Sequence, residues 1–340
     1  MQILVNLIRQ QHQERPRVQS YTLEVEPSIT ILDCLNQIKW TLDGSLSFRK
    51  NCRNTICGSC AIRINGRAAL ACKQNVGQEL ERSAKMNAQL RSAESPSSAT
   101  STPEITLAPL GNMPVIKDLV VDMGSFWHNL ETVQPYISTA GRQVPEREFL
   151  QVPADRAQLD QTGNCIMCGA CYSDCNALEV SGDFVGPHAL AKGYRTLADS
   201  RDTARAERLS EYQQGTAGVW GCTRCFNCNT VCPMDVAPLD QINRIKSHIL
   251  AQETIQPSRA VRHRKVLVDL VQQGGWIDER KFGLRVLGNG LRDWRGLWSL
   301  LPLGLAMVMR RKFPVSFQPS PGTNEVRSLI NSVKMHESDS

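Results

Sequence analysis

The chain has 340 residues, of which 41% are hydrophobic and 21% charged, a composition that is ordinary for a soluble globular protein and excludes a disordered or fibrous chain. The formal charge is +6, and thirteen cysteines are present. The opening MQILVNLIRQ lacks the features of a secretory signal, and no apolar run reaches the roughly eighteen residues of a membrane-spanning helix. We therefore expect no signal peptide, no transmembrane helix and a reducing compartment, where clustered cysteines favour metal over disulfides.

Residues 1–80 predict a small mixed domain. Ile3, Val5 and Leu7 alternate with polar residues as in a strand, and Tyr21 to Glu26 is the expected partner strand. These two strands are separated by a polar turn.

Apolar residues from Ile31 to Leu42 then recur at helical spacing. Cys34 shares their face and is predicted to be a buried core thiol. The turn Asn65-Gly66 lies between two short apolar segments and predicts a β-hairpin.

The rest of the chain divides into three parts. Residues 81–104, centred on SPSSATSTPE, are predicted to be a flexible insertion or linker. Residues 105–255 predict an α-helical domain, with helices opened by Pro114, Pro187 and Pro238 and a charged helix over residues 202–212. Residues 256–340 are predicted to be an extension that docks to a partner or a membrane surface.

Twelve cysteines fall into three spaced runs. The runs are Cys52-x4-Cys57-x2-Cys60 with Cys72, Cys165-x2-Cys168-x2-Cys171-x3-Cys175, and Cys222-x2-Cys225-x2-Cys228-x3-Cys232. The first spacing is typical of plant-type [2Fe–2S] ferredoxins, and the other two are typical of bacterial-type [4Fe–4S] ferredoxins. Tetrahedral zinc is the alternative, but triplets closed by a fourth cysteine favour clusters.

In two-cluster ferredoxins the last cysteine of each run binds the other cluster. The predicted ligands of the first centre are Cys52, Cys57, Cys60 and Cys72, those of the second are Cys165, Cys168, Cys171 and Cys232, and those of the third are Cys175, Cys222, Cys225 and Cys228. Gly58 and Gly169 would let backbone N–H groups approach the sulfurs. About −2 for each oxidised cluster would bring the chain near neutrality, so its basic charge does not indicate nucleic-acid binding.

The sequence offers no catalytic site of its own. It has no Gly-rich phosphate loop and no nucleophile paired with a base, and its six histidines are scattered. We expect the histidines to be surface or structural residues. The cysteines therefore indicate an electron-transfer subunit whose chemistry lies in its partners.

Several stretches resemble the iron–sulfur subunits of succinate dehydrogenase and fumarate reductase. They are SLSFRKNCRNTICGSCAIRINGRAALAC, PLGNMPVIKDLVVDM, GNCIMCGACYSDC and FVGPHALAKGYRTLADSRD. The resemblance implies an α+β chain with an N-terminal β-grasp [2Fe–2S] ferredoxin domain and an all-α two-cluster domain like bacterial ferredoxins. It further implies electron flow from FAD in a flavoprotein subunit, which holds the succinate site, through three clusters to quinone. The implied location is peripheral, on the cytoplasmic side of a membrane.

Three features depart from common members of that family. Cys225 is extra, so the third centre is predicted to be [4Fe–4S] rather than [3Fe–4S]. Asn176 replaces a proline, and the aromatic and histidine residues of the common quinone site are missing after it. The phrase VWGCTRCFNCNTVCP resembles heterodisulfide reductase C subunits. The membrane-side partner is therefore either a membrane anchor or a cysteine-rich subunit like heterodisulfide reductase B.

Two functional alternatives remain beside succinate dehydrogenase. One is a fumarate reductase or heterodisulfide-reductase-like electron-transfer subunit, and the other is a zinc-stapled interaction module. The apolar run Leu297 to Met309, with cationic flanks, suits either a membrane surface or a protein partner. Pro302 and Gly304 argue against one uninterrupted helix there.

Overall fold

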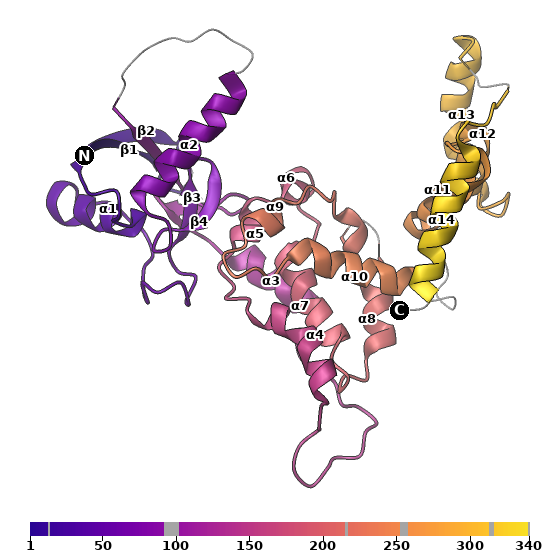
Figure 1. Ribbon diagram of the computed structural model, residues 1–340, viewed down its shortest axis with the longest axis horizontal. Coiled ribbons are helices and arrows are strands. Elements are labelled where there is room, and N and C mark those ends of the chain that lie inside the picture. The colour runs from indigo at the N-terminus through magenta and orange to yellow at the C-terminus, as the bar shows by residue number, and fades with distance from the viewer. Residues whose placement is uncertain (13, 92–101, 215–216, 252–257, 313–315, 339–340) are drawn as a thin grey trace. The chain divides into compact units, whose positions relative to one another are not determined.

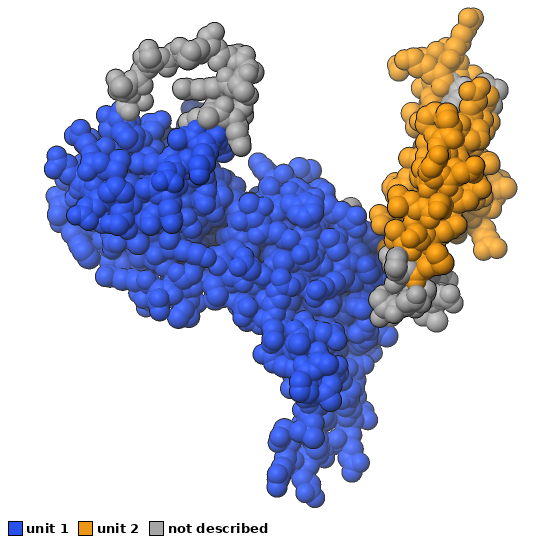
Figure 2. Space-filling model, in the orientation of Figure 1, with its two compact units in different colours: residues 1–249 blue, residues 250–340 orange. Residues whose placement is uncertain are grey.

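The computed structural model describes residues 1–12, 14–91, 102–214, 217–251, 258–312 and 316–338. It divides into unit 1, Met1–Ile249, and unit 2, Leu250–Ser340 (Figure 2). Unit 1 combines a mixed β-sheet with many short helices, whereas the described part of unit 2 is helical (Figure 1). The α+β class predicted from the sequence is confirmed.

Five strands of unit 1 form a sheet in the order β2-β1-β5-β3-β4. Their bounds are β1 Gln2–Arg9, β2 Arg17–Glu24, β3 Ala61–Ile64, β4 Arg67–Leu70 and β5 Glu104–Ala108. β5 runs parallel to β1, with Val5 opposite Ile105, and antiparallel to β3, with Ile64 opposite Leu107. These four side chains are buried in the core beside the sheet.

Helices α1, Ile31–Gln37, and α2, Val76–Arg91, lie beside the sheet (Figure 1). Thr30 begins α1 with a capping box, in which its hydroxyl accepts from the backbone of Asp33 while the Asp33 carboxylate accepts from the backbone of Thr30. A π-helical turn, Ile38–Leu42, continues α1. Cys34 is 1% exposed, so the prediction of a buried core thiol is confirmed.

The region predicted to be a flexible insertion contains regular structure at both ends. Residues 81–91 belong to α2, and Glu104 begins β5, the middle strand of the sheet. Residues 92–101 lie outside the described residues. The prediction of flexibility is therefore wrong for residues 81–91, because they continue a helix that begins at Val76.

The prediction of a helix that begins at Pro114 is wrong for its first half. Strands β6, Val115–Lys117, and β7, Val120–Val121, form a hairpin there, and helix α3 begins later, at Gly124–Thr132. The turn between the strands places Asp118 at φ +52°. Its carboxylate accepts hydrogen bonds from Arg9 Nε at 2.7 Å and from the backbone of Ser47 at 2.9 Å, and these contacts favour the turn over a helix.

The remaining part of unit 1 is helical. Its helices are α4 Pro153–Gly163, α5 Ala170–Ser173, α6 Asn176–Val180, α7 Pro187–Leu197, α8 Arg205–Tyr212, α9 Asn227–Thr230 and α10 Pro238–Ala251. The predicted starts at Pro187 and Pro238 are confirmed. The buried Arg208 of α8 donates to the Asp202 carboxylate and to the carbonyls of Gln134 and Tyr136, so it ties α8 to the segment after α3.

Unit 2 consists of α11 Arg259–Gly274, α12 Glu279–Val286, α13 Trp294–Met309 and α14 Thr323–Ser338. α11 packs against both α12 and α14. The prediction that Pro302 interrupts the apolar run is wrong, since α13 continues through it. A proline inside a helix removes one backbone hydrogen bond, here the one to the carbonyl of Trp298. Within the described part of the chain, no helix is long and apolar enough to span a membrane.

Candidate metal centres

The first cysteine group lies in the loop before β3 and at the end of β4. The backbone N–H groups of Asn54 and Cys57 donate to the sulfur of Cys52 at 3.3 and 3.4 Å, and that of Cys52 donates to Cys57 at 3.5 Å. Arg53 and Thr55 adopt positive φ, which curls the loop around these sulfurs. Such N–H contacts stabilise thiolates and tune the potential of a bound cluster.

The four thiols of this group have unequal surroundings. Burial works against ionisation of Cys57, but hydrogen bonds from Ser59 and from the Cys52 backbone outweigh it and lower the pKa of this thiol to about 6. Burial raises the pKa of Cys60 to about 12, although a hydrogen bond from the Cys72 backbone works in the opposite direction. Thr55 Oγ1 lies 4.0 Å from the sulfur of Cys72. All four cysteines of the first run are thus near one another.

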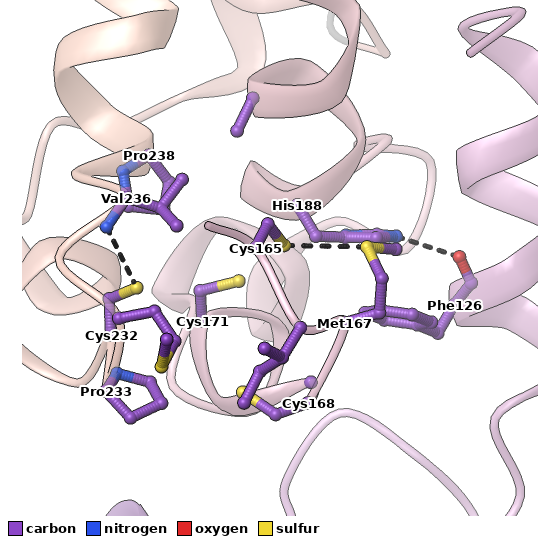
Figure 3. Close-up of a pocket in the computed structure, with 14 residues that line it drawn as sticks. Phe126, Cys165, Met167, Cys168, Cys171, His188, Cys232, Pro233, Val236 and Pro238 are labelled. Carbon is purple, nitrogen blue, oxygen red and sulfur yellow. Dashed lines mark hydrogen bonds between the residues drawn. The ribbon is translucent and has the colours of Figure 1, made fainter. Parts of the chain in front are cut away.

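The second group surrounds a cavity between α5, α7 and the start of α10 (Figure 3). The cysteines that line it are Cys165, Cys168, Cys171 and Cys232. Three come from the second run and one from the end of the third. The backbone N–H of Val236 donates to the sulfur of Cys232 at 3.3 Å.

The third group lines a separate cavity, to which Ala177 of α6 and Ile242 of α10 also contribute. Its cysteines are Cys175, Cys222, Cys225 and Cys228, accompanied by apolar side chains such as Phe184 and Leu239. Burial raises the pKa of Cys228 to about 12 and also raises that of Cys175. Cys225 is exposed at the surface, although it lines the same cavity.

The second and third runs repeat the same backbone conformation. Met167 and Gly169 flank Cys168 at φ +54° and +81°, and Arg224 and Phe226 flank Cys225 at φ +58° and +65°. A short helix follows in each case, α5 or α9. Glycine adopts positive φ easily, but the residue of the third run that corresponds to Gly169 is Phe226, for which this conformation is strained. The third run therefore keeps the loop shape of the second run without a glycine at this position.

The first and second groups meet at Gly58. This residue has φ +70°, and a Cβ atom on it would lie 2.8 Å from Cβ of Cys168 and 3.2 Å from the carbonyl oxygen of Ile166. From the sequence, Gly58 was expected to let backbone N–H groups approach the sulfurs. The structure adds that the residue allows two cysteine loops to touch.

Polar residues outside the predicted cysteine ligands hold these loops together. Asp174 accepts from Arg63 Nε at 3.1 Å and from the backbone of Ala68 at 2.8 Å, which joins the second run to β3 and β4. Asn112 Nδ2 donates to the carbonyls of Tyr172 and Cys175 at 2.8 and 3.1 Å. These partners are more than fifty positions apart in the chain, so local sequence patterns gave no signal for them.

His188 of α7, which was expected to be a surface or structural residue, is a buried structural residue and also forms part of the wall of the second cavity (Figure 3). It is 2% exposed, stacks on Phe126 with ring centroids 3.9 Å apart, and its Nε2 lies 2.8 Å from the Phe126 carbonyl oxygen. Burial lowers its pKa to about 4, so the ring is neutral at physiological pH.

The residues present fit iron–sulfur clusters. Each cavity of the helical part offers four cysteine sulfurs in an otherwise largely apolar lining, which is the donor chemistry of a cubane cluster.

Comparison with known proteins gives matches over both parts of unit 1. Residues 4–128 match the family described as "2Fe-2S iron-sulfur cluster binding domain", and residues 161–236 match the "4Fe-4S dicluster domain". The chain is 34% identical to "Succinate dehydrogenase [ubiquinone] iron-sulfur subunit 3, mitochondrial" of Arabidopsis thaliana, over 71% of this chain and 72% of that one.

Two bacterial relatives give similar values. The fumarate reductase iron-sulfur subunit of Mycobacterium tuberculosis is 35% identical over 71% of this chain and 90% of its own. The succinate dehydrogenase iron-sulfur subunit of Paracoccus denitrificans is 33% identical over 71% and 85%.

Among solved structures, a chain of the Mycobacterium smegmatis Sdh1 complex in the apo form superposes with a TM-score of 0.60. It is 22% identical and covers 76% of this chain and 99% of its own length. The two chains share a fold.

Proposed function

The chain belongs to the family of iron–sulfur subunits of succinate dehydrogenase and fumarate reductase, and we propose that it carries electrons from the FAD of a flavoprotein subunit toward quinone. Iron–sulfur clusters supply one-electron transfer when they are bound. The protein's part is to hold three such groups in a row and to shield them from water. The observation that carries the proposal is the gathering of twelve cysteines into three groups of four.

We assign the ligands by these groups. Cys52, Cys57, Cys60 and Cys72 would hold [2Fe–2S]; Cys165, Cys168, Cys171 and Cys232 would hold [4Fe–4S]; and Cys175, Cys222, Cys225 and Cys228 would hold the third cluster. The cavity linings support the exchange of the last cysteine between the two helical groups. A fourth cysteine at the third cavity supports [4Fe–4S] over [3Fe–4S] there.

The contact at Gly58 supports the order of the relay. It brings the loop of the first group against Cys168 of the second, and electron transfer is faster when centres are close. Asp174 and Asn112 hold the same two regions together through side-chain hydrogen bonds. We further propose that the five-stranded sheet with α1 and α2 is a β-grasp domain and that the helical part after it is a two-cluster, ferredoxin-like domain.

The partners are proposed from the same relationship. A flavoprotein subunit would supply the electrons, and a membrane anchor or a cysteine-rich subunit would receive them on the cytoplasmic side of the membrane. FAD would be bound by the flavoprotein and not by this chain.

The test is to purify the chain together with its flavoprotein under anaerobic conditions and to measure metal, sulfide and redox response. We expect about ten iron and ten acid-labile sulfide atoms per chain, and reduction of the clusters when succinate is added. The presence of zinc without sulfide would contradict the proposal and would indicate a zinc-stapled interaction module instead. Clusters that stay oxidised while the flavin is reduced by succinate would overturn the proposed route.

A further inference from the structure

Helix α13 of unit 2 exposes an apolar stripe. Trp294, Trp298, Leu301, Leu305 and Val308 follow one another at intervals of four, three, four and three residues, so they share one face of the helix. Each of them is between 50% and 72% exposed. At a rise of about 1.5 Å per residue the stripe is roughly 21 Å long.

A face of α13 that adjoins the stripe packs against the preceding segment of unit 2. Leu297 packs at Gly288, where a Cβ atom would lie 2.6 Å from its side chain, and Leu300 packs at Gly283 of α12 at 3.7 Å. These contacts fix the rotation of α13 about its own axis. The stripe lies beside these contacts and remains exposed, and none of the sixteen residues of α13 is buried within the described structure.

Cations lie at both ends of the stripe. Arg292 and Arg295 lie at its start, and Arg310, Arg311 and Lys312 follow its end; all five are exposed. No acidic residue occurs between positions 294 and 312, and Asp293 caps the helix by accepting from the backbone of Gly296 at 2.9 Å. The apolar stripe therefore has positively charged residues at both of its ends.

This pattern fits an anionic lipid surface. A helix that lies flat in the headgroup region buries its apolar face among the acyl chains, while cations at both ends meet lipid phosphates and tryptophan rings lie at the interface. Leu303 and Met309 are also exposed, at 60% and 83%, so the apolar surface is broader than the seam of a packed helix pair.

We propose that α13 binds the surface of an anionic membrane, with Trp298, Leu301 and Leu305 inserted below the phosphates. This interaction is independent of the clusters and of the electron donor. It would give the chain a contact with lipid of its own, beside any contact through partner subunits.

The test uses the full chain with its clusters and vesicles of two compositions, phosphatidylcholine alone and phosphatidylcholine with about one third phosphatidylglycerol. In flotation experiments the wild type should bind the anionic vesicles at least about tenfold more strongly, and moderate salt should weaken the binding. The variant L301D/L305D should lose at least about tenfold in binding. L329D/V333D on α14 is the matched control, because it adds the same two carboxylates four positions apart at residues exposed to a similar degree, 67% and 51%, outside α13.

Two results would overturn the proposal. One is failure of the wild type to bind anionic vesicles. The other is binding by L301D/L305D equal to that of L329D/V333D, with the visible spectrum of the clusters confirming that both variants are folded. If L301D/L305D instead dissociates a partner subunit from the purified complex while vesicle binding is absent, α13 is a protein-docking helix and the lipid assignment is wrong.

Discussion

Cys225 determines whether the third cysteine group has four thiols or three. Replacement by serine, C225S, should convert that centre toward a three-iron form and remove about one iron per chain, because three sulfurs remain to hold it. The oxidised complex should then gain the EPR signal typical of [3Fe–4S]. C34S is the control, since Cys34 belongs to none of the three groups and its replacement should leave the iron content unchanged. An unchanged spectrum in C225S would show that Cys225 is not a ligand.

Cys34 gives a prediction about alkaline pH. Burial raises the pKa of its thiol from 9.0 to about 12, so the folded chain keeps a proton that the unfolded chain releases above pH 9. Stability from this thiol is therefore complete below about pH 9 and is lost as the pH rises toward 12, by about 1.4 kcal/mol at pH 10. Denaturant midpoints measured from pH 8 to 10 should fall less steeply in C34A than in wild type. Equal slopes would contradict the assignment.

Gly58 and Gly66 form a matched pair. Both have positive φ, +70° and +81°, but a Cβ at Gly66 would meet nothing within 4 Å, whereas at Gly58 it would overlap Cys168. G58A and G66A therefore share a backbone cost of about 1 kcal/mol, and only G58A adds steric overlap, of about 1–3 kcal/mol. The thermal midpoint of G58A should be several degrees below that of G66A. Equal midpoints would mean that the two cysteine loops are not in contact.

At the scale of elements, Asp174 joins the β3–β4 hairpin to the segment between α5 and α6. Its carboxylate accepts from Arg63 and from the Ala68 backbone, and it is only 10% exposed. D174A should lower stability by about 2–4 kcal/mol, because these two donors and the Ser173 hydroxyl lose their acceptor. Thermal unfolding followed by cluster absorbance measures this effect. D183A removes an exposed carboxylate nearby in the sequence and should change the midpoint little; an equal loss in both variants would exclude the hairpin contact as the cause.

The elements that the sequence predicted correctly are those with a local signal. Alternation of apolar residues located β1, and prolines at helix starts located α7 and α10. β5 was missed because it is five residues long, directly follows a polar segment, and gains its stability from strands that lie about 40 and 100 positions away. The β6–β7 hairpin was missed for a related reason, since Asp118 finds its partners on Arg9 and Ser47.

The candidate site shows the same division. Repeated short spacings predict the grouping of the cysteines, and the cavity linings support the proposed exchange of Cys175 and Cys232 between runs, which stays a prediction until the clusters are measured. Asp174, Asn112 and His188 could not be found in this way. Each acts on backbone or rings that only the folded chain brings near.

At the scale of the whole molecule, the proposed ligand exchange makes the helical part of unit 1 depend on its metal. Two groups of four thiols each join segments fifty-seven positions apart, and burial raises the pKa of several of these thiols, including Cys168 to about 11. Apart from the thiols, α5 packs against α9, and Asn227 Nδ2 donates to the carbonyl of Asp174 at 3.2 Å. Metal binding is then part of the folding free energy.

Removal of iron should therefore unfold one part of the chain and spare another. After anaerobic chelation, we expect amide hydrogen exchange to accelerate by at least about a hundredfold in residues 165–175 and 222–232, which include α5 and α9. Unit 2 contains no cysteine, so α11 and α14 serve as the internal control and should exchange at their original rates. Mass spectrometry of peptides resolves these regions within one sample. Unchanged exchange in residues 165–232 after complete loss of iron would show that the cysteine loops fold without metal, and acceleration throughout unit 2 would show that its helices depend on the clusters as well.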